Sequence, residues 1–224
     1  MNLIAHRVAR FDEPENTIRA LKRAVECGAD AVEIDVRLSS DHEMVVIHDE
    51  TLERTTNGSG KVGEKTLKQL QTLDAGKDET IPTLSEVLSL VKQLGIALVI
   101  ELKETGMEDI VVREIGEAEM ARNVVISSFF HSSLLKLKEL APNLKTGVII
   151  SSLPVFPVTL ARDAKADIIF QRYPRLNKEY VEEASRNKIE IYTWTLNTVE
   201  DFEKARELGV KGIVTDNPCL FKSH

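Results

Sequence analysis

AVEIDVRL at residues 31–38 and ALVIELK at residues 97–103 are two strand-like segments in which charged and aliphatic side chains alternate. Because side chains alternate between the two faces of a strand, Glu33 and Asp35 share one face of the first segment. Glu101 and Lys103 share one face of the second by the same rule. The opposite face of each segment is aliphatic. If the two strands are neighbours, their charged faces form one cluster.

Six further strand-like segments occur along the chain, with helical patterns between them. The eight predicted strands span 2–7, 31–38, 97–103, 123–129, 145–151, 167–172, 189–196 and 210–216. The predicted helices span 15–27, 83–94, 108–121, 132–141, 157–165, 177–187 and 199–208. Eight strands alternating with helices predict an α/β fold of the (β/α)8 TIM-barrel type. The alternative is an open doubly wound sheet, which usually has fewer strands, and no glycine-rich phosphate loop follows the first predicted strand.

One segment interrupts the alternation of strands and helices. EMVVIHD at 43–49 follows the second predicted strand after the turn SSDH, which is too short for the crossover that a parallel neighbour needs. The segment is therefore predicted to fold back as an antiparallel hairpin, with Leu38 near Met44 and His48 near Ile34. Residues 50–82 are polar and rich in glycine, and they predict a small insertion within a single domain of residues 1–224.

The carboxylates of the two opening segments predict a metal site. In a closed barrel the helix-facing side of each strand is apolar, so Glu33, Asp35 and Glu101 are expected to point to the barrel axis near the carboxyl ends of the strands. Three unpaired carboxylates would repel one another there. They predict a divalent cation, and all-oxygen ligands favour Mg²⁺ or Ca²⁺ over zinc. The alternative is a structural ion-pair cluster with Arg37 and Lys103.

Two histidines are predicted to join these carboxylates. His6 ends the first predicted strand, and His48 ends the hairpin beside the second. A pair of imidazoles can divide acid–base work, one taking a proton from a nucleophile and the other giving one to a leaving oxygen. Arg7 has a permanently charged fork suited to phosphate, and Lys103 can neutralise the carboxylates or bind a phosphate oxygen. The cluster therefore predicts an anion-binding catalytic site.

Charge, hydropathy and cysteine content argue against several classes of protein. The net charge of −7 disfavours a nucleic-acid-coating surface, and no apolar run approaches the roughly 18 residues of a membrane span. No nucleic-acid partner and no stable membrane insertion are expected. The start, MNLIAHR, lacks the pattern of a secretory signal, so a cytoplasmic location is expected. Two cysteines make no disulfide framework, and Cys27, at a predicted helix end, is expected to be buried packing.

A set of short motifs occurs in order along nearly the whole chain. They are HR at 6–7, PENT at 14–17, EIDV at 33–36, VVIHD at 45–49, IPTLSEVL at 81–88, IELK at 100–103, SSF at 127–129, WTLN at 194–197 and TDNP at 215–218. With these motifs the chain resembles the glycerophosphodiester phosphodiesterases, which share a barrel architecture with the phosphatidylinositol-specific phospholipases C. Any one motif is weak, but their joint occurrence in order is highly specific.

The resemblance implies hydrolysis of a glycerophosphodiester to sn-glycerol 3-phosphate and an alcohol, assisted by a divalent metal. It implies that the catalytic residues are His6 and His48, that the metal ligands are Glu33, Asp35 and Glu101, and that the substrate-binding residues are Arg7, Lys103, Glu15, Asn16, Phe129 and Trp194. It favours His6 as the proton acceptor and His48 as the donor.

The chain departs from the family pattern at one position. The family usually has glycine directly after the His-Arg pair, where this chain has Val8. Glycine would permit a positive φ and the close approach of a ligand, and valine restricts both. The loop is therefore expected either to take an ordinary β conformation or to reshape the entrance of the site.

Two other functions remain open from the sequence. One is a lysophospholipase D or a cyclising phosphodiesterase of the same superfamily, with a larger or lipid-like leaving alcohol. The loop SSLPVFPV at 151–158 bears on it, because its apolar residues Leu153, Val155, Phe156 and Val158 form either an apolar entrance or, as we expect, a packed loop. The other is a phosphate-binding barrel without catalysis, disfavoured because both histidines and all three carboxylates are present. The leaving alcohol and the formation of a homodimer are left open.

Overall fold

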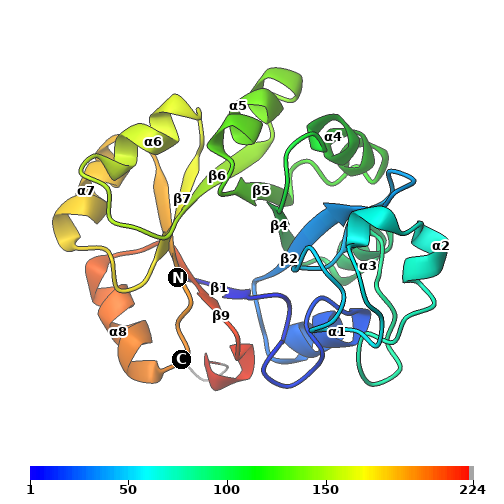
Figure 1. The fold of residues 1–224 in the computed structure, drawn as a ribbon. Helices are drawn as coiled ribbons and strands as arrows, with labels where there is room; N and C mark the ends of the chain where they lie inside the picture. Colours follow the sequence, from blue (N-terminus) through cyan, green and yellow to red (C-terminus); the bar gives the residue numbers. More distant parts are fainter. Residues whose placement is uncertain (222–224) are drawn as a thin grey trace.

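The computed structural model describes residues 1–221, which form a closed barrel of parallel strands with helices on its outside (Figure 1). The barrel strands are β1 (Asn2–Ala5), β2 (Ala31–Leu38), β4 (Ala97–Leu102), β5 (Val124–Ser128), β6 (Lys145–Ile150), β7 (Ile168–Arg172), β8 (Glu190–Trp194) and β9 (Gly212–Thr215). Strand β1 pairs in parallel with both β2 and β9, and this pairing closes the barrel. The predicted (β/α)8 fold is confirmed.

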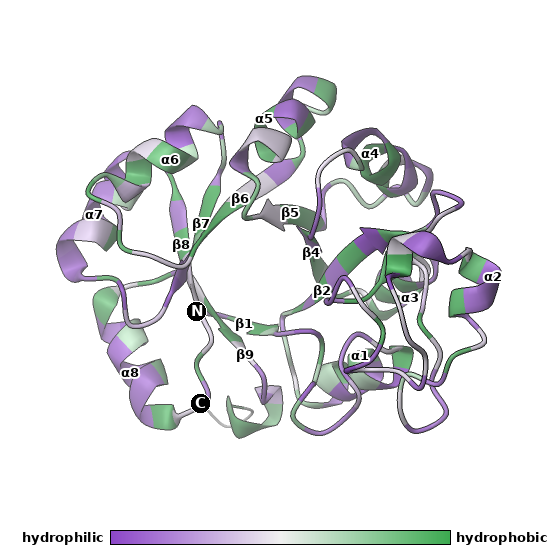
Figure 2. Ribbon diagram, in the orientation of Figure 1, coloured by the Kyte–Doolittle hydropathy of each residue, from purple (hydrophilic) through white to green (hydrophobic). Residues whose placement is uncertain are grey.

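The outer layer contains the seven predicted helices. They are α1 (Ile18–Glu26), α3 (Leu84–Leu94), α4 (Glu108–Glu117), α5 (His131–Leu140), α6 (Pro157–Asp163), α7 (Lys178–Arg186) and α8 (Val199–Leu208). Gly95 and Gly209 end α3 and α8 in the left-handed conformation that is common for glycine after a helix. Figure 2 shows hydrophobic residues along the barrel strands and hydrophilic residues on the outward sides of the helices.

The first helix begins three residues later than predicted. Helix α1 starts at Ile18, and the Thr17 side chain caps it by accepting a hydrogen bond from the Ala20 N–H. Asn16 has a φ of 60° and donates from its side chain to Oδ2 of Asp35 at 2.8 Å. The PENT segment is therefore a loop that ends in a helix cap, and it contacts the Asp35 carboxylate of β2.

The predicted hairpin is present beside β2. Strand β3 (Met44–Val46) pairs antiparallel with β2, and Leu38 lies opposite Met44 as predicted. The Ile47 N–H then donates to the Asp35 carbonyl at 2.9 Å, which continues the ladder for one more bond. His48 follows directly, so the hairpin brings this histidine to the carboxyl end of β2.

The segment after the hairpin packs onto β3. It contains a 3-10 turn, η1 (Val62–Glu64), and a short helix, α2 (Leu67–Leu70), which the sequence analysis did not predict. A capping box starts α2: the Thr66 side chain accepts a hydrogen bond from the Gln69 N–H, and the Gln69 side chain accepts one from the Thr66 N–H. A small apolar cluster attaches the segment to β3; its members are Val45, Ile47, Leu52, Val62, Leu70 and Ile81.

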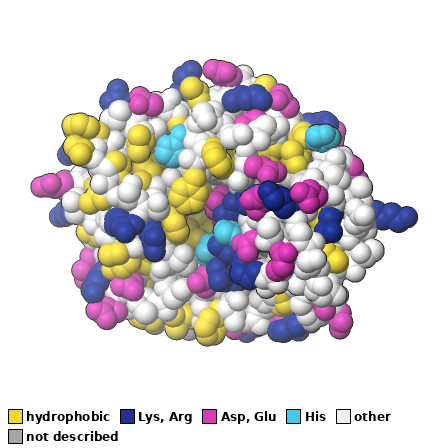
Figure 3. Space-filling model, in the orientation of Figure 1, with side chains coloured by type: hydrophobic (Ala, Val, Ile, Leu, Met, Phe, Trp, Pro, Cys, Tyr) yellow, Lys and Arg dark blue, Asp and Glu magenta, His cyan; other side chains and the backbone are white. Residues whose placement is uncertain are grey.

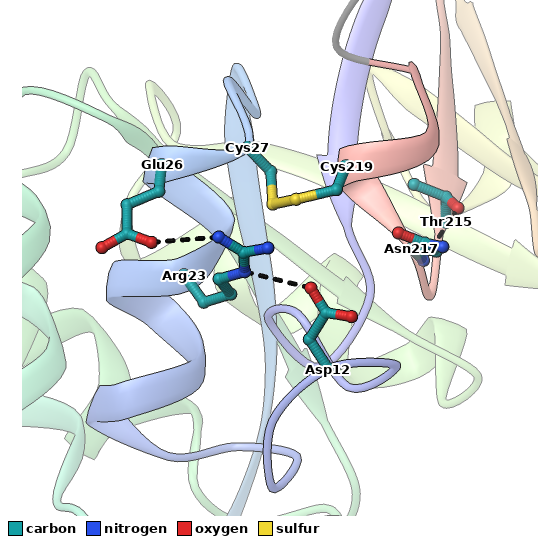
Figure 4. The surroundings of a disulfide bond; sticks show 7 residues. All are labelled: Asp12, Arg23, Glu26, Cys27, Thr215, Asn217 and Cys219. Carbon is teal, nitrogen blue, oxygen red and sulfur yellow. Dashed lines mark hydrogen bonds and ion pairs between the residues drawn. A yellow bond between two sulfur atoms is a disulfide. The ribbon is translucent and has the colours of Figure 1, made fainter.

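A disulfide joins the first helix of the chain to the turn that follows the last strand (Figure 4). Cys27 at the end of α1 is bonded to Cys219 in η2 (Pro218–Phe221), with the two Cα atoms 4.5 Å apart. Cys27 is buried as predicted, but the expectation of no disulfide was wrong. The two cysteines are 192 residues apart, and only closure of β9 onto β1 brings them together.

Aromatic rings fill the inside of the barrel below the site. The rings of Phe170 on β7 and Tyr192 on β8 lie 5.5 Å apart. Gly147 and Gly212 make room for them, because a Cβ at either glycine would lie 2.5 Å from the neighbouring ring. These rings form an apolar floor, so the cavity above them opens at the carboxyl ends of the strands.

Candidate active site

A cavity of about 210 Å³ lies at the carboxyl ends of the barrel strands. Its lining residues are His6, Arg7, Glu33, His48, Val99, Glu101, Lys103, Ser127, Phe129, Ile149, Phe170, Trp194 and Val214. Figure 3 shows the central hollow, with charged side chains crowded on one side of it and hydrophobic side chains on the other. Every predicted site residue except Asp35, Glu15 and Asn16 lines this cavity.

The three predicted carboxylates lie together in the wall of the cavity. Asp35 on β2 is paired in register with Glu101 on β4. Glu33 lies two residues before Asp35 on the same face of β2. Oxygen atoms of the three side chains lie within 4.8 Å of one another. All three residues are buried, which agrees with the alternation of faces along the two strands.

Burial and mutual repulsion raise the pKa values of two carboxyl groups in this cluster, and neighbouring cations lower the pKa of the third. Burial, followed by the charges of Asp35 and Glu101, raises the pKa of Glu33 well above its usual range. Burial and the charge of Asp35 raise the pKa of Glu101 to about 7. Burial also opposes ionisation of Asp35, but Lys103 and Arg7 outweigh it and lower the pKa of that carboxyl. The cluster thus lacks enough positive charge to keep all three carboxylates ionised.

The oxygen atoms of the cluster fit a divalent cation. Glu33 Oε1 is buried without a hydrogen-bond partner within residues 1–221, and Asp35 Oδ1 has only an ion-pair contact, to Lys103 Nζ at 2.9 Å. A buried carboxylate oxygen without a donor costs free energy unless a cation compensates it. Carboxylate oxygens are the ligands that Mg²⁺ and Ca²⁺ prefer. The acidic cluster can therefore hold a divalent ion.

The alternative of a purely structural ion-pair cluster accounts for only part of the geometry. Lys103 does pair with Glu101 and Asp35. Arg37, however, turns away, because it donates to the His48 carbonyl at 2.9 Å and lies 3.5 Å from Glu104. The part of this alternative that relied on Arg37 is therefore wrong.

Arg7 reaches the carboxylates from the end of β1. Its Nη1 donates to Glu15 Oε1 at 3.0 Å, and its Nε lies 3.5 Å from Asp35 Oδ2. Arg54, from the segment after the hairpin, holds the same Glu15 through Nη2 at 2.7 Å. Glu15 and Asn16 therefore lie behind the cavity wall, where they hold Arg7 and Asp35 in place.

The backbone after His6 turns through the left-handed region. Arg7 has a φ of 48° and Val8 a φ of 65°, so the first of the two alternatives for Val8, an ordinary β conformation, was wrong. In this conformation the Arg7 N–H donates to Glu33 Oε2 at 2.7 Å, and the Val8 N–H donates to the Glu33 carbonyl at 3.0 Å. Val8 is also buried in the main core. Val8 therefore adopts a left-handed conformation that is disfavoured for a β-branched residue.

Each of the two histidines has a carboxylate partner. His6 Nδ1 lies 2.6 Å from Oδ1 of Asp216, and His48 Nδ1 lies 2.6 Å from Oδ1 of Asp49. An ionised carboxylate only accepts hydrogen bonds, so Nδ1 of each ring carries the hydrogen and Nε2 remains for a ligand in the cavity. Burial, more than any other influence, lowers the pKa of His48.

Sequence reasoning missed both acidic partners. Asp49 directly follows His48, and Asp216 directly follows β9, the strand that pairs with β1. Asp216 is held in turn by Asn197 Nδ2 at 2.8 Å and lies 3.5 Å from Arg10 Nε. The signal was available, since both acids fall inside quoted motifs, VVIHD and TDNP, and β9 must adjoin β1 in a closed barrel.

An aromatic pair borders the apolar side of the cavity. The rings of Phe129 and Trp194 meet edge to face with centroids 6.0 Å apart. Trp194 Nε1 donates to the Phe170 carbonyl at 2.9 Å, which fixes the indole at the rim. The cavity therefore has charged walls from β1, β2 and β4 and apolar walls from β5 to β9.

Comparison with known proteins gives a consistent family. A sequence profile described as the glycerophosphoryl diester phosphodiesterase family matches residues 6–220. A glycerophosphodiester phosphodiesterase from Caldanaerobacter subterraneus is 40% identical, over 96% of this chain and 94% of its own. An Oleispira antarctica phosphodiesterase, solved in complex with the product sn-glycerol-3-phosphate, is 29% identical with a TM-score of 0.91 over 100% of this chain and 96% of its own. A glycerophosphodiester phosphodiesterase from Agrobacterium tumefaciens is 29% identical with a TM-score of 0.88 over 100% of both chains.

Proposed function

The chain belongs to the glycerophosphoryl diester phosphodiesterase family, and on this premise we propose that it cleaves glycerophosphodiesters to sn-glycerol 3-phosphate and an alcohol, with two histidines and a divalent cation. One observation carries the proposal: two imidazoles, each paired with a carboxylate, meet a buried carboxylate cluster in one cavity. The cluster lacks enough positive charge to balance its three carboxylates. General acid–base groups and a charge-stabilising cation are what phosphodiester cleavage requires.

Glu33, Asp35 and Glu101 are the proposed ligands of Mg²⁺ or Ca²⁺. When bound, the ion supplies Lewis-acid stabilisation of charge on the phosphoryl oxygens. Arg7 and Lys103 line the same cavity and are proposed to bind the phosphate, because a guanidinium and an ammonium both complement anionic oxygens. Glu15 holds the Arg7 fork in the orientation that this contact needs.

His6 and His48 are the proposed acid–base pair. Nε2 of His6 accepts a proton from the attacking oxygen, which is either water or the glycerol hydroxyl of the substrate. His48 acts from its imidazolium form, with a hydrogen on both ring nitrogens, and its Nε2 donates a proton to the departing alcohol. The carboxylates of Asp216 and Asp49 hold the two rings in the required tautomer and stabilise the imidazolium form.

The division of the cavity favours one orientation of the substrate. The phosphoglycerol portion is polar and suits the charged wall from β1, β2 and β4. The alcohol portion then lies toward the aromatic pair Phe129 and Trp194. A pocket with few polar groups on this side leaves room for more than one leaving alcohol.

Two enzymatic alternatives share this site. A lysophospholipase D reaction has a substrate with an acyl chain on its glycerol, so in that reaction the acyl chain rather than the leaving alcohol lies along the apolar wall of the cavity. A cyclising reaction releases a cyclic glycerophosphate, because the glycerol hydroxyl rather than water attacks. A phosphate-binding barrel without catalysis has less support, since both histidines and all three carboxylates are in place.

The geometry of the active site does not bear on the cellular location or the assembly of the chain. Within residues 1–221, no helix is both long and apolar enough to cross a membrane. Cytoplasmic location, a single domain over residues 1–224, the absence of a nucleic-acid partner and the formation of a homodimer all stay predictions. The Cys27–Cys219 disulfide counts against a reducing compartment, because disulfides persist mainly in oxidising ones.

A metal-supplemented screen of glycerophosphodiesters tests the proposed function. Purified protein is incubated with the choline, ethanolamine, glycerol and inositol diesters, and release of sn-glycerol 3-phosphate is measured. We expect turnover of at least one diester, and turnover slower by on the order of 10²-fold or more in a His6→Ala variant. Phosphorus NMR of the products separates direct hydrolysis from a cyclic intermediate. Absence of turnover on every diester with Mg²⁺ or Ca²⁺ present would refute the proposal.

A further inference from the structure

The loop between β6 and α6 presents apolar side chains to solvent beside the active-site mouth. Val155 is 85% exposed and Phe156 is 69% exposed, and Leu153 is also exposed. The prediction of a packed loop is correct only for Val158. Phe130, after the neighbouring strand β5, adds a fourth exposed apolar side chain. Exposed apolar groups that gather at one place usually mark an interaction site.

The loop is fastened from below, so its apolar side chains are held outward. The side-chain amide of the buried Gln171 donates to the Ser152 carbonyl at 2.9 Å. Arg175 Nη1 donates to the Ser151 carbonyl. Val158, in the first turn of α6, is inserted in the main core. The exposure of Val155 and Phe156 is therefore a property of an anchored loop.

Two cations accompany the apolar side chains. Arg172 ends β7, the strand beside β6, and Arg175 lies in the loop that follows. Both are exposed, and the Arg172 side chain has no ion-pair or hydrogen-bond partner within residues 1–221. We call this set the rim patch; it consists of Phe130, Leu153, Val155, Phe156, Arg172 and Arg175. Figure 3 shows hydrophobic and basic side chains together on the α5–α7 side of the central hollow.

We propose that the rim patch docks the barrel mouth onto an anionic lipid surface. Apolar side chains flanked by guanidinium groups suit the boundary between phosphate headgroups and acyl chains. The chain carries a net charge of −7, so a local pair of arginines is needed for any approach to an anionic surface. The docking is peripheral, because the patch consists of side chains in loops and at the end of one strand.

A second copy of the chain is the less suitable occupant. Phe129, which lines the cavity, adjoins Phe130 of the patch, so a protein partner seated there would cover the mouth of the site. A lipid surface instead presents phosphodiester headgroups to the same mouth. Docking stands independently of the proposed function, whereas delivery of lysophospholipid headgroups to the cavity rests on it.

Vesicle co-sedimentation of the full chain tests the proposal. The probes are phosphatidylcholine vesicles with and without phosphatidylglycerol, at low and high salt. We expect binding to the anionic vesicles at low salt, with loss of about tenfold or more in the Val155→Ser/Phe156→Ser double variant. Arg172→Gln is expected to weaken binding to anionic vesicles only.

A matched control uses apolar residues at the other end of the barrel. Leu94 and Leu140 lie at the exposed ends of α3 and α5, and the Leu94→Ser/Leu140→Ser variant is expected to bind vesicles like the parent chain. All variants are expected to turn over a water-soluble glycerophosphodiester at the parent rate. Equal binding by the Val155→Ser/Phe156→Ser variant, or no binding by the parent chain, would overturn the proposal. A dimer that this variant dissociates would assign the patch to a second copy and overturn it as well.

Discussion

The Nδ1 atom of His6 lies 2.6 Å from the Oδ1 atom of Asp216, although 210 residues of chain separate the two. His48 and Asp49 repeat the same contact between neighbours in sequence. Both rings therefore present Nε2 to the cavity, one from β1 and one from the hairpin after β2. The site thus holds two imidazoles that both use Nδ1 for a carboxylate partner.

Asp216→Asn is expected to lower kcat by on the order of 10²-fold, with a smaller change in KM. An asparagine amide can donate to Nδ1 of His6 and so stabilise the wrong tautomer. The measurement is a kcat and kcat/KM profile against pH, in which the limb that depends on the His6 base should move. Asp12→Asn is the matched control, because Asp12 pairs with Arg23 outside the site (Figure 4). An Asp216→Asn variant with the parent kcat and pH profile would refute this positioning role.

Replacing each histidine separately distinguishes the acid from the base. His6→Ala and His48→Ala are each expected to reduce turnover of a natural diester by on the order of 10²-fold or more. With a p-nitrophenyl ester, whose leaving group needs no proton, His48→Ala should recover much of its rate and His6→Ala should not. Circular dichroism checks that both variants are folded. Recovery by His6→Ala alone would reverse the assigned order, and near-normal turnover by both would end the two-histidine scheme.

Chelation is expected to abolish activity, and Mg²⁺ or Ca²⁺ should restore it. A second readout is thermal: an ion that binds only the folded chain stabilises it by about 2.7 kcal/mol at 100 times its Kd. The ion should therefore raise the Tm of the chelator-treated parent. Glu101→Gln should lose most of this rise, while Glu207→Gln, an exposed residue of α8, should keep it. Full activity after exhaustive chelation would remove the metal from the mechanism.

The barrel and the carboxylate cluster could be predicted because both follow from the pattern of residues within short segments of the sequence. Alternation of faces is set by residue parity, so Glu33, Asp35 and Glu101 had to share the inside of two adjacent strands. The hairpin register followed from the length of one turn, which placed Met44 opposite Leu38. No long-range information was needed for either inference.

The contacts that were missed depend on closure of the barrel or on side-chain direction. Cys27 meets Cys219 only because the last strand returns to the first. The same closure sets Asp216 against His6. Parity places Arg37 on the charged face, but its long side chain reaches Glu104 and the His48 carbonyl beyond the end of the strand. Composition alone likewise gave no sign that Val155 stays outside while Val158 enters the core.

Glu114 on α4 is expected to make stability fall as pH rises. Burial, together with the charges of Glu43 and Glu117, raises its pKa from 4.5 to about 7. The folded chain therefore holds this proton more tightly than the unfolded chain, so stability decreases from pH 4.5 upward and the loss is complete above about pH 7. Glu114→Gln should be more stable than the parent by ~1 kcal/mol at pH 8, after allowance for solvent screening, and equal to it near pH 4. Urea unfolding at both pH values measures the difference, and Glu207→Gln, which is exposed, should show none. A constant difference at all pH values would contradict the assignment.

Val8 offers a test of the left-handed loop that carries Arg7. At an ordinary buried position an alanine variant is more stable than a glycine variant by roughly 0.5–1 kcal/mol, because glycine loses more backbone entropy on folding. At a φ of 65° this order should disappear or reverse, since glycine alone adopts the conformation without cost. Val8→Gly is therefore expected to be at least as stable as Val8→Ala in urea unfolding, although both lose buried methyl groups relative to the parent. Val36, buried in β2, is the matched control, and there the alanine variant should be the more stable. The same preference for alanine at Val8 would mean that the loop is not left-handed, and the hydrogen bonds from Arg7 and Val8 to Glu33 would then have to be abandoned.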